Sequence, residues 1–104
     1  MKIVHGAEVF EELVNLSSYI AFENEAAAQE FLDACNETFQ FLAGNNKIGA
    51  VRNFNNPLLK DVRVWRVKGF EKYLIFYQPI DDGIKILHVV HSARNWNTLF
   101  DDES

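Results

Sequence analysis

The most constraining feature of the sequence is residues 62–94, where three apolar runs are separated by two tight turns. The runs are rich in β-branched and aromatic residues, which is typical of strands. The first turn contains Gly69, and the second contains Asp82-Gly83, a pair that tolerates the positive φ of hairpin turns. We therefore predict an antiparallel meander whose strands span residues 61–67, 72–78 and 84–91.

Two amphipathic helices are predicted before the meander, because apolar residues recur there at three- and four-residue steps. The first helix spans residues 7–22, and its inward stripe is Phe10, Leu13, Val14, Ser17, Ile20 and Ala21. The second runs from an N-cap at Asn24 to residue 43, with the inward stripe Ala28, Phe31, Leu32, Cys35, Phe39 and Leu42. Their short connection makes the helices antiparallel.

The remaining segments have weaker patterns. Residues 2–5 are short and apolar, which favours an edge strand, and residues 45–57 are predicted to form a loop because they are rich in Asn and Gly. Asn95 could cap a short C-terminal helix in which Trp96, Leu99 and Phe100 share one face. The predicted fold is α+β, with an N-terminal strand and a helical hairpin packed on a small twisted antiparallel sheet.

The length of 104 residues fits a single domain that spans residues 1–104. Cys35 is the only cysteine, so an internal disulfide is excluded and a cysteine-based zinc site is not expected. No apolar run reaches the roughly 18 residues needed to span a bilayer, and the N-terminus lacks the apolar core of a signal peptide. We expect a cytoplasmic protein with no membrane partner and no cofactor.

The formal net charge of −5 is unevenly distributed. Residues 1–46 carry eight acids and one base, whereas residues 47–94 carry nine bases and four acids. The last residues are again acidic, with Asp101, Asp102 and Glu103. An acidic half and a basic half therefore share one domain, and the basic half contains the meander.

Strand alternation assigns the meander side chains to two faces. In the first strand, one face carries Val62, Val64 and Arg66, and the other carries Arg63, Trp65 and Val67. In the second strand, one face carries Tyr73, Ile75 and Tyr77, and the other carries Leu74, Phe76 and Gln78. In the third strand the two sets are Ile84, Ile86, His88 and Val90, and Lys85, Leu87, Val89 and His91. Because two helices can cover only one face, we expect the other to be partly open and to carry tyrosine, arginine and histidine.

Such a face suits a polymer or a partner peptide. A metal-free ribonuclease would need a base for the 2′-hydroxyl, an acid for the leaving oxygen and cations for the phosphorane. The side chains that could supply these roles are Arg63, Arg66, Tyr77, His88, His91 and Arg94. Each of them also has an ordinary structural interpretation as ion-paired surface or sheet packing. His88 and His91 are predicted on opposite faces, which argues against a shared metal ion.

The sequence resembles the RelE/ParE superfamily of type II toxin–antitoxin toxins over nearly its whole length, and it is closer to the ParE branch. The most specific parts of the resemblance are residues 66–77 and the motif His91-Ser92-Ala93-Arg94-Asn95, in which Asn95 replaces the aspartate usual in the family. The resemblance implies an antitoxin whose C-terminal segment wraps around the toxin, and hence a toxin–antitoxin hetero-oligomer.

The resemblance leaves three functions open. ParE relatives inhibit DNA gyrase, RelE relatives cut mRNA on the ribosome, and an inactive relative would act only as an antitoxin-binding module. The acidic tail repels RNA phosphates, which favours the gyrase inhibitor, a protein that does no bond chemistry itself. We expect the partner-binding residues to be Arg63, Trp65, Arg66, Tyr73, Tyr77, Arg94 and Trp96. If the chain is a ribonuclease, the catalytic residues would be Arg63, Arg66, Tyr77, His91 and Arg94.

Overall fold

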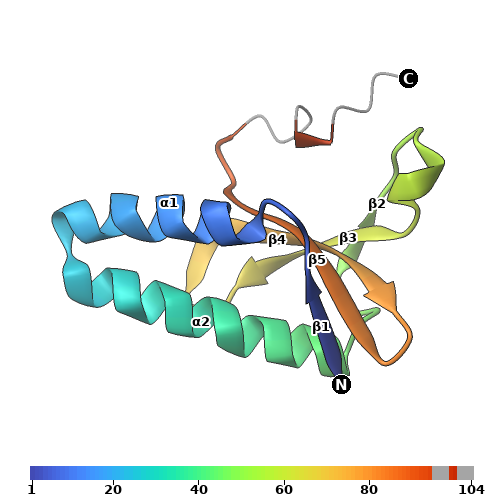
Figure 1. Ribbon diagram of the computed structural model, residues 1–104, viewed down its shortest axis with the longest axis horizontal. Helices are drawn as coiled ribbons and strands as arrows, with labels where there is room; N and C mark the ends of the chain where they lie inside the picture. Colours follow the sequence, from blue (N-terminus) through green and yellow to red (C-terminus); the bar gives the residue numbers. More distant parts are fainter. Residues whose placement is uncertain (95–98, 101–104) are drawn as a thin grey trace.

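The computed structural model describes residues 1–94 and 99–100, which fold into two helices beside a five-stranded sheet (Figure 1). In chain order the elements are β1 (Lys2–His5), α1 (Val9–Glu23), α2 (Glu25–Gly44), β2 (Ala50–Arg52), the 3-10 turn η1 (Pro57–Leu59), β3 (Val62–Val67), β4 (Phe70–Ile80) and β5 (Gly83–His91). The expected α+β architecture is confirmed.

The helical hairpin forms as predicted. Asn24 caps α2, because its side-chain oxygen accepts a hydrogen bond from the backbone N–H of Ala27 at 3.0 Å. The inward stripe of α2 is also confirmed, since Ala28, Phe31, Cys35, Phe39 and Leu42 are buried. Figure 1 shows α1 and α2 antiparallel, joined at the end of the molecule farthest from β2.

The predicted inward stripe of α1 is wrong in part. Phe10 is 78% exposed and Val14 is 43% exposed, although both were assigned to the core. The residues of α1 that contact the main core are Val9, Leu13, Leu16 and Ile20, which also recur at three- and four-residue steps. The predicted and observed stripes share Leu13 and Ile20, and their mean directions differ by roughly 70°, since each residue advances about 100° around the helix.

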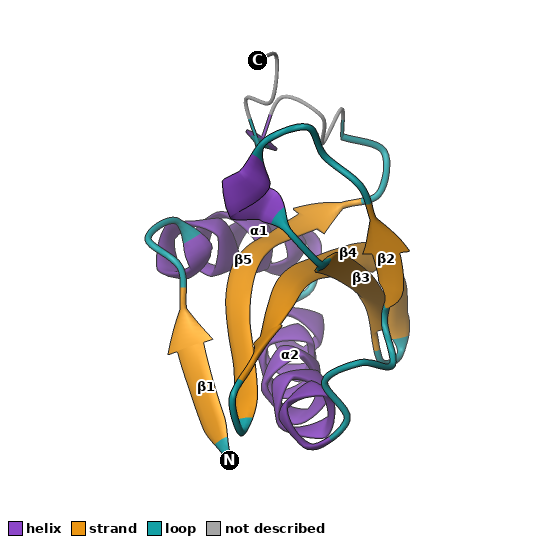
Figure 2. Cartoon of the chain, turned by 90° about the vertical axis from the view of Figure 1, so that its right-hand side faces the viewer, coloured by secondary structure: helices purple, strands orange, loops and turns teal. Residues whose placement is uncertain are grey.

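The sheet has the strand order β1-β5-β4-β3-β2. The meander of β3, β4 and β5 is antiparallel as predicted, whereas β1 pairs in parallel with β5, so the sheet is mixed. The segment predicted as a loop contains β2, which pairs antiparallel with residues 62–64 of β3. Figure 2 shows the sheet curving around α2, with β1 and β2 at its two edges.

Both predicted turns are present, and each has two residues between the paired strand ends. Val67 pairs with Phe70 across Lys68-Gly69, and Gly69 has a φ of 80°. Ile80 pairs with Gly83 across Asp81-Asp82, where Asp82 has a φ of 61°. These positive φ values explain why glycine and aspartate occupy these turns.

The main core lies between the helices and one face of the sheet. Buried side chains of α2 pack on Val67, Ile75, Tyr77, Ile84, Ile86 and Val89. Tyr73 and Tyr77 belong to this helix-covered face, not to an open one. The expected open face of tyrosine, arginine and histidine is therefore incorrect with respect to the tyrosines.

A register shift in the β4–β5 pairing changes the predicted faces of β5. Tyr77 pairs with Ile86, but Phe76 pairs with His88, so Leu87 is an extra residue in β5. Because one added residue reverses the alternation, Val89 joins the helix-covered face while His88 and Val90 lie on the opposite one. His88 and His91 nevertheless lie on opposite faces, as predicted.

The opposite face of the sheet carries a second, smaller core. Val62, Phe76 and Val90 are buried there, and several half-buried residues pack on them: Phe54, Leu59, Val64, Leu74, Leu87, Leu99 and Phe100. Phe100 contacts the rings of Phe54 and Phe76. The start of the predicted C-terminal helix, with Asn95 and Trp96, lies outside the described residues.

Candidate functional site

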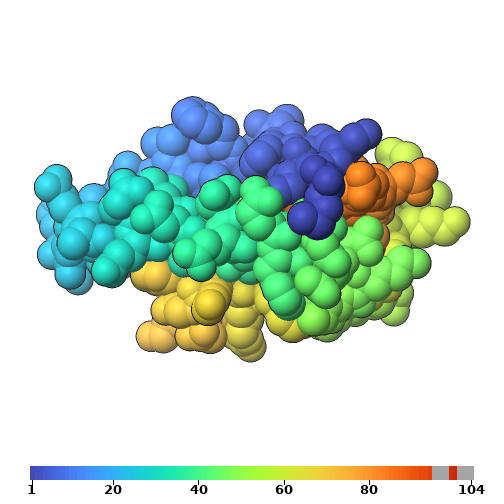
Figure 3. Space-filling view, turned by 90° about the horizontal axis from the view of Figure 1, so that it is seen from below, coloured from blue at the N-terminus to red at the C-terminus, as the bar shows by residue number. Residues whose placement is uncertain are grey.

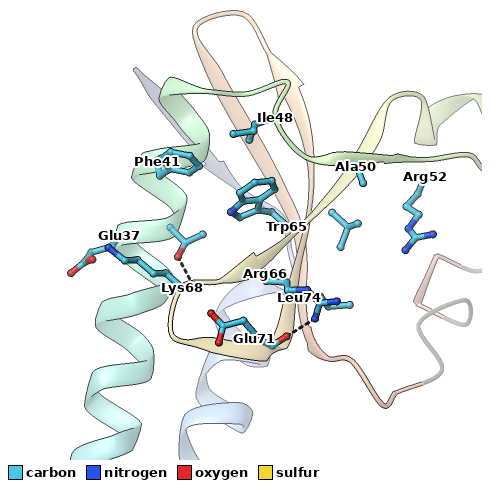
Figure 4. Close-up of a pocket in the computed structure, with 12 residues that line it drawn as sticks. Glu37, Phe41, Ile48, Ala50, Arg52, Trp65, Arg66, Lys68, Glu71 and Leu74 are labelled. Carbon is cyan, nitrogen blue, oxygen red and sulfur yellow. Dashed lines mark hydrogen bonds between the residues drawn. The ribbon is translucent and has the colours of Figure 1, made fainter.

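A pocket of about 920 Å³ opens between α2, β2 and the β3–β4 hairpin. Its lining comes from four parts of the chain, and Figure 4 shows Trp65 in the middle with Phe41 of α2 to one side. The lining residues are Glu37, Thr38, Phe41, Ile48, Ala50, Arg52, Val64, Trp65, Arg66, Lys68, Glu71 and Leu74. We refer to this site as the β3-edge pocket.

The floor of the β3-edge pocket is apolar and aromatic. The rings of Phe41 and Trp65 lie with centroids 6.0 Å apart and an interplanar angle of 33°. Phe41 and Ile48 are each 44% exposed, so a large apolar area faces solvent there. Exposed contiguous apolar surface of this kind is typical of sites where a protein binds a partner.

The rim of the pocket is charged. Arg52, Arg66 and Lys68 supply three positive charges, against the two carboxylates of Glu37 and Glu71. One nitrogen of the Arg66 guanidinium donates to the backbone carbonyl of Glu71 at 2.7 Å, which orients the side chain beside the pocket (Figure 4). An apolar floor with an excess of cations at the rim suits a partner segment that combines apolar and acidic residues.

The pocket lies beside an edge of β3 that β2 does not cover. β2 pairs with β3 only as far as Val64, whereas β3 continues to Val67. Within the described residues, no strand pairs with this side of β3 beyond Val64. Such an edge can accept an additional strand from another chain, because its backbone groups on that side lack a strand partner.

Two hydrogen-bonded connections hold the walls of the pocket. The Thr38 hydroxyl accepts from the backbone N–H of Lys68 at 3.1 Å and donates to the carbonyl of Ala34 at 2.7 Å, which ties the β3–β4 turn to α2. On the other wall, the backbone N–H of Gly49 donates to the Tyr77 hydroxyl at 2.9 Å. A Cβ at position 49 would lie 2.6 Å from that hydroxyl oxygen, so only glycine fits.

Arg63 and Tyr77, both predicted as site residues, hold the loop before β2. Arg63 donates to the carbonyls of Lys47 and Gly49 and to the carboxylate of Asp61. Tyr77 is completely buried, and this burial raises the pKa of its hydroxyl despite the opposing effects of the Gly49 N–H and of Arg63. The side chain of Tyr77 is therefore not exposed at the surface in this conformation.

The other residues predicted for the site lie in separate parts of the chain and away from the pocket or outside the described residues. Tyr73 is half-buried against Phe31 on the helix-covered face, and burial, followed by the nearby phenol of Tyr19, raises the pKa of its hydroxyl. His91 lies edge-on to Tyr73, and its Nδ1 accepts from the N–H of Ala93. Arg94 is exposed, and Trp96 lies outside the described residues. Of the predicted partner-binding residues that the structure describes, Trp65 and Arg66 line the pocket and the others do not.

A family model described as the ParE toxin of the type II toxin-antitoxin system parDE matches residues 7–96. The chain belongs to the ParE toxin family. A search of curated proteins found no matching relative.

Membership of the ParE family confirms the predicted superfamily and its ParE branch, and it implies a cognate antitoxin as partner. Among residues 1–94 and 99–100, no helix is long and apolar enough to cross a membrane. The same residues contain no group of three or more His, Cys, Asp or Glu side chains placed to hold a metal ion. Burial raises the pKa of the Cys35 thiol of this ParE-family chain to about 12, so it stays protonated at neutral pH.

Several pocket residues were not predicted from the sequence. Phe41 and Thr38 lie on α2, and Ile48 lies in the segment treated as a loop. Ile48 is an apolar residue in a polar, glycine-rich segment, and this was only a weak sequence signal that it belongs to a site. Phe41 follows Phe39 by two residues, so the two cannot lie on the same face of a helix; this spacing indicated that one of them faces outward.

Proposed function

We propose that the chain is a ParE-type toxin that inhibits DNA gyrase when it is not neutralised, and that its antitoxin binds in the β3-edge pocket. The observation that carries this proposal is an open apolar pocket beside an unpaired strand edge, in a chain that the ParE family model matches over residues 7–96. The proposed action is binding and not bond cleavage.

The positions of the polar side chains support binding over ribonuclease chemistry. Acid–base cleavage of RNA requires a base, an acid and cations within hydrogen-bond reach of one phosphate. Here Tyr77 is buried, Arg63 is bonded to loop carbonyls, and His91 lies against Tyr73. Arg66, in contrast, lines the pocket with Trp65.

The purified chain is expected to block supercoiling by gyrase or to accumulate cleaved DNA in a plasmid assay. Unchanged gyrase activity, together with codon-dependent cuts in mRNA on ribosomes, would instead favour the ribonuclease, and Arg66→Ala or His91→Ala should then abolish cleavage in a folded protein. If expression of the chain without antitoxin leaves growth unaffected and neither assay responds, both toxin functions fail and the antitoxin-binding module is supported.

The proposed mode of antitoxin binding follows from the pocket. An extended antitoxin segment would pair with the free edge of β3 at Trp65–Val67, adding a strand to the sheet. Its apolar side chains would occupy the floor formed by Phe41 and Trp65, and its carboxylates would meet the cations of the rim, including Arg66. Aromatic and arginine side chains in such pockets usually contribute most of the binding energy.

Trp65→Ala is expected to weaken antitoxin binding by about 10–100-fold, because truncation of a central aromatic residue costs about 1.4–2.8 kcal/mol. The antitoxin is to be sought as the product of a short reading frame beside this gene, and the dissociation constant is measured by titration calorimetry. Arg66→Glu should also weaken binding. Lys85→Glu makes the same charge change on the exposed surface of β5 and is the matched control. Equal affinities for Arg66→Glu and Lys85→Glu would contradict the proposed location.

A further inference from the structure

The outward surface of α1 carries large apolar side chains that no element among residues 1–94 and 99–100 covers. Phe10 is 78% exposed, Val14 is 43% exposed and Phe22 is 91% exposed. Phe10 and Val14 are one turn apart, and Phe22 lies two turns beyond Val14 with Ser18 between them, so the three lie along a row of four-residue steps that winds about 120° around the helix. We call these three apolar residues the α1 stripe.

The α1 stripe is distinct from the core-facing side of the same helix. Val9, Leu13, Leu16 and Ile20 already supply the contacts of α1 with the main core. Phe10, Val14 and Phe22 belong to neither core cluster. Because large apolar groups left in water add nothing to folding, three of them exposed along one helix indicate a surface that binds another molecule.

The charge around the stripe is negative. Residues 3–46, which include the whole helical hairpin, contain no Lys or Arg but eight carboxylates. Glu11 follows Phe10 in the first turn of α1, and Glu23 and Glu25 follow Phe22 at the end of α1 and the start of α2. A second copy of the chain would bring the same carboxylates against these, so like-charge repulsion disfavours self-association through this face.

We propose that the α1 stripe binds a basic amphipathic helix of a protein partner. An apolar stripe on such a helix would pack on Phe10, Val14 and Phe22, and its flanking Lys or Arg side chains would meet Glu11, Glu23 and Glu25. This is helix-on-helix recognition, in which apolar residues at three- and four-residue steps give affinity and opposite charges give orientation.

The α1 stripe and the β3-edge pocket belong to different parts of the molecule and prefer partners of opposite charge. Figure 3 shows α2 lying between α1 and the β3–β4 hairpin on the surface seen from below. The pocket is lined by residues of α2, the β2 segment and the hairpin, and by none of α1. The inference therefore goes beyond the proposed antitoxin site, and each surface can be tested without the other.

The test uses two designed peptides of about 18 residues with leucine at helical spacing, one with lysine and one with glutamate at all other positions. Binding to the full chain is measured by fluorescence anisotropy of labelled peptide. The lysine peptide is expected to bind at least about tenfold more tightly than the glutamate peptide. A lysine peptide of the same composition with scrambled leucine positions should bind as weakly as the glutamate peptide.

The variant Phe10→Ser/Phe22→Ser keeps the charge of the chain and is expected to weaken binding of the lysine peptide by about tenfold or more. Leu58→Ser, at a residue of η1 that is 82% exposed, is the matched control and should leave the affinity unchanged, as should Trp65→Ala. Glu11→Lys should weaken binding through charge alone, which gives a second variant if the double serine variant does not fold.

Three results would overturn the inference. The first is equal affinity for the lysine peptide and either of the other peptides, and the second is unchanged affinity of the Phe10→Ser/Phe22→Ser variant. The third is a dimer of the chain in sedimentation that the same variant dissociates, which would make a second copy the occupant. A negative gyrase assay affects none of these measurements, so failure of the proposed function and failure of this inference are separable.

Discussion

Replacing Phe31 by alanine is expected to lower the free energy of unfolding by about 3–5 kcal/mol, the range for a buried phenylalanine. The Phe31 side chain is completely buried where α2 crosses the sheet. Its ring contacts Phe70 with centroids 5.4 Å apart and Tyr73 with centroids 4.8 Å apart. Alanine would remove both ring contacts and leave a cavity between the helix and β4, which the surrounding backbone cannot close completely.

The measurement is urea unfolding followed by circular dichroism, with Phe22→Ala as the matched control. Phe22 is 91% exposed on α1, so its truncation to alanine should change the free energy of unfolding by no more than about 0.5 kcal/mol. A similar loss for the two variants would contradict the assignment of Phe31 to the core and Phe22 to the surface.

The sequence could predict both helices but not the rotation of α1. Helical periodicity is satisfied equally well by the predicted stripe that begins at Phe10 and by the observed core residues Val9, Leu13, Leu16 and Ile20. Periodicity alone cannot choose between two such stripes, and the choice depends on which one meets the sheet. In α2 only one stripe is strongly apolar, with charged residues elsewhere, so its core face was predicted correctly.

The meander and its turns were predictable because each strand and each turn has a strong local signal. The strand β2 was missed because it has only three residues and lies in a segment rich in Asn and Gly. The parallel pairing of β1 with β5 depends on contacts between distant parts of the chain, which local patterns do not contain. The extra residue Leu87 in β5 has no distinctive sequence signal, so the faces of His88 and Val89 were reversed.

The candidate site was only partly predictable. Trp65 and Arg66 were chosen from the meander, and both line the β3-edge pocket. Phe41, whose ring lies beside that of Trp65, was missed. The pocket that contains both residues lies where β2 ends before the end of β3, and the sequence does not show where β2 ends. The alternation of β3 correctly separated Arg63 from Arg66, and the structure gives Arg63 the task of holding the loop before β2.

The carboxylate of Glu12 in α1 makes two polar contacts with β5 that were not predicted from the sequence. One oxygen of Glu12 lies 2.6 Å from Nδ1 of His88, and the other accepts the backbone N–H of Val89 at 2.9 Å. The side chains of Glu12 and His88 are only 13% and 9% exposed. β1 pairs with β5 only as far as Ile86, so Glu12 takes the place of a strand partner beyond that point. The ring of Phe100 contacts that of His88.

Glu12→Ala is expected to lower the free energy of unfolding by about 2–4 kcal/mol, because it leaves the buried N–H of Val89 and the ring of His88 without their partner. Glu12→Gln should lose less, since an amide can still accept from Val89 and donate to Nδ1 of His88. Glu11→Ala, at the exposed neighbouring residue, is the control and should change stability by no more than about 0.5 kcal/mol. A double-mutant cycle with His88→Ala measures the coupling, and additive effects of the two substitutions would show that the contact does not stabilise the fold.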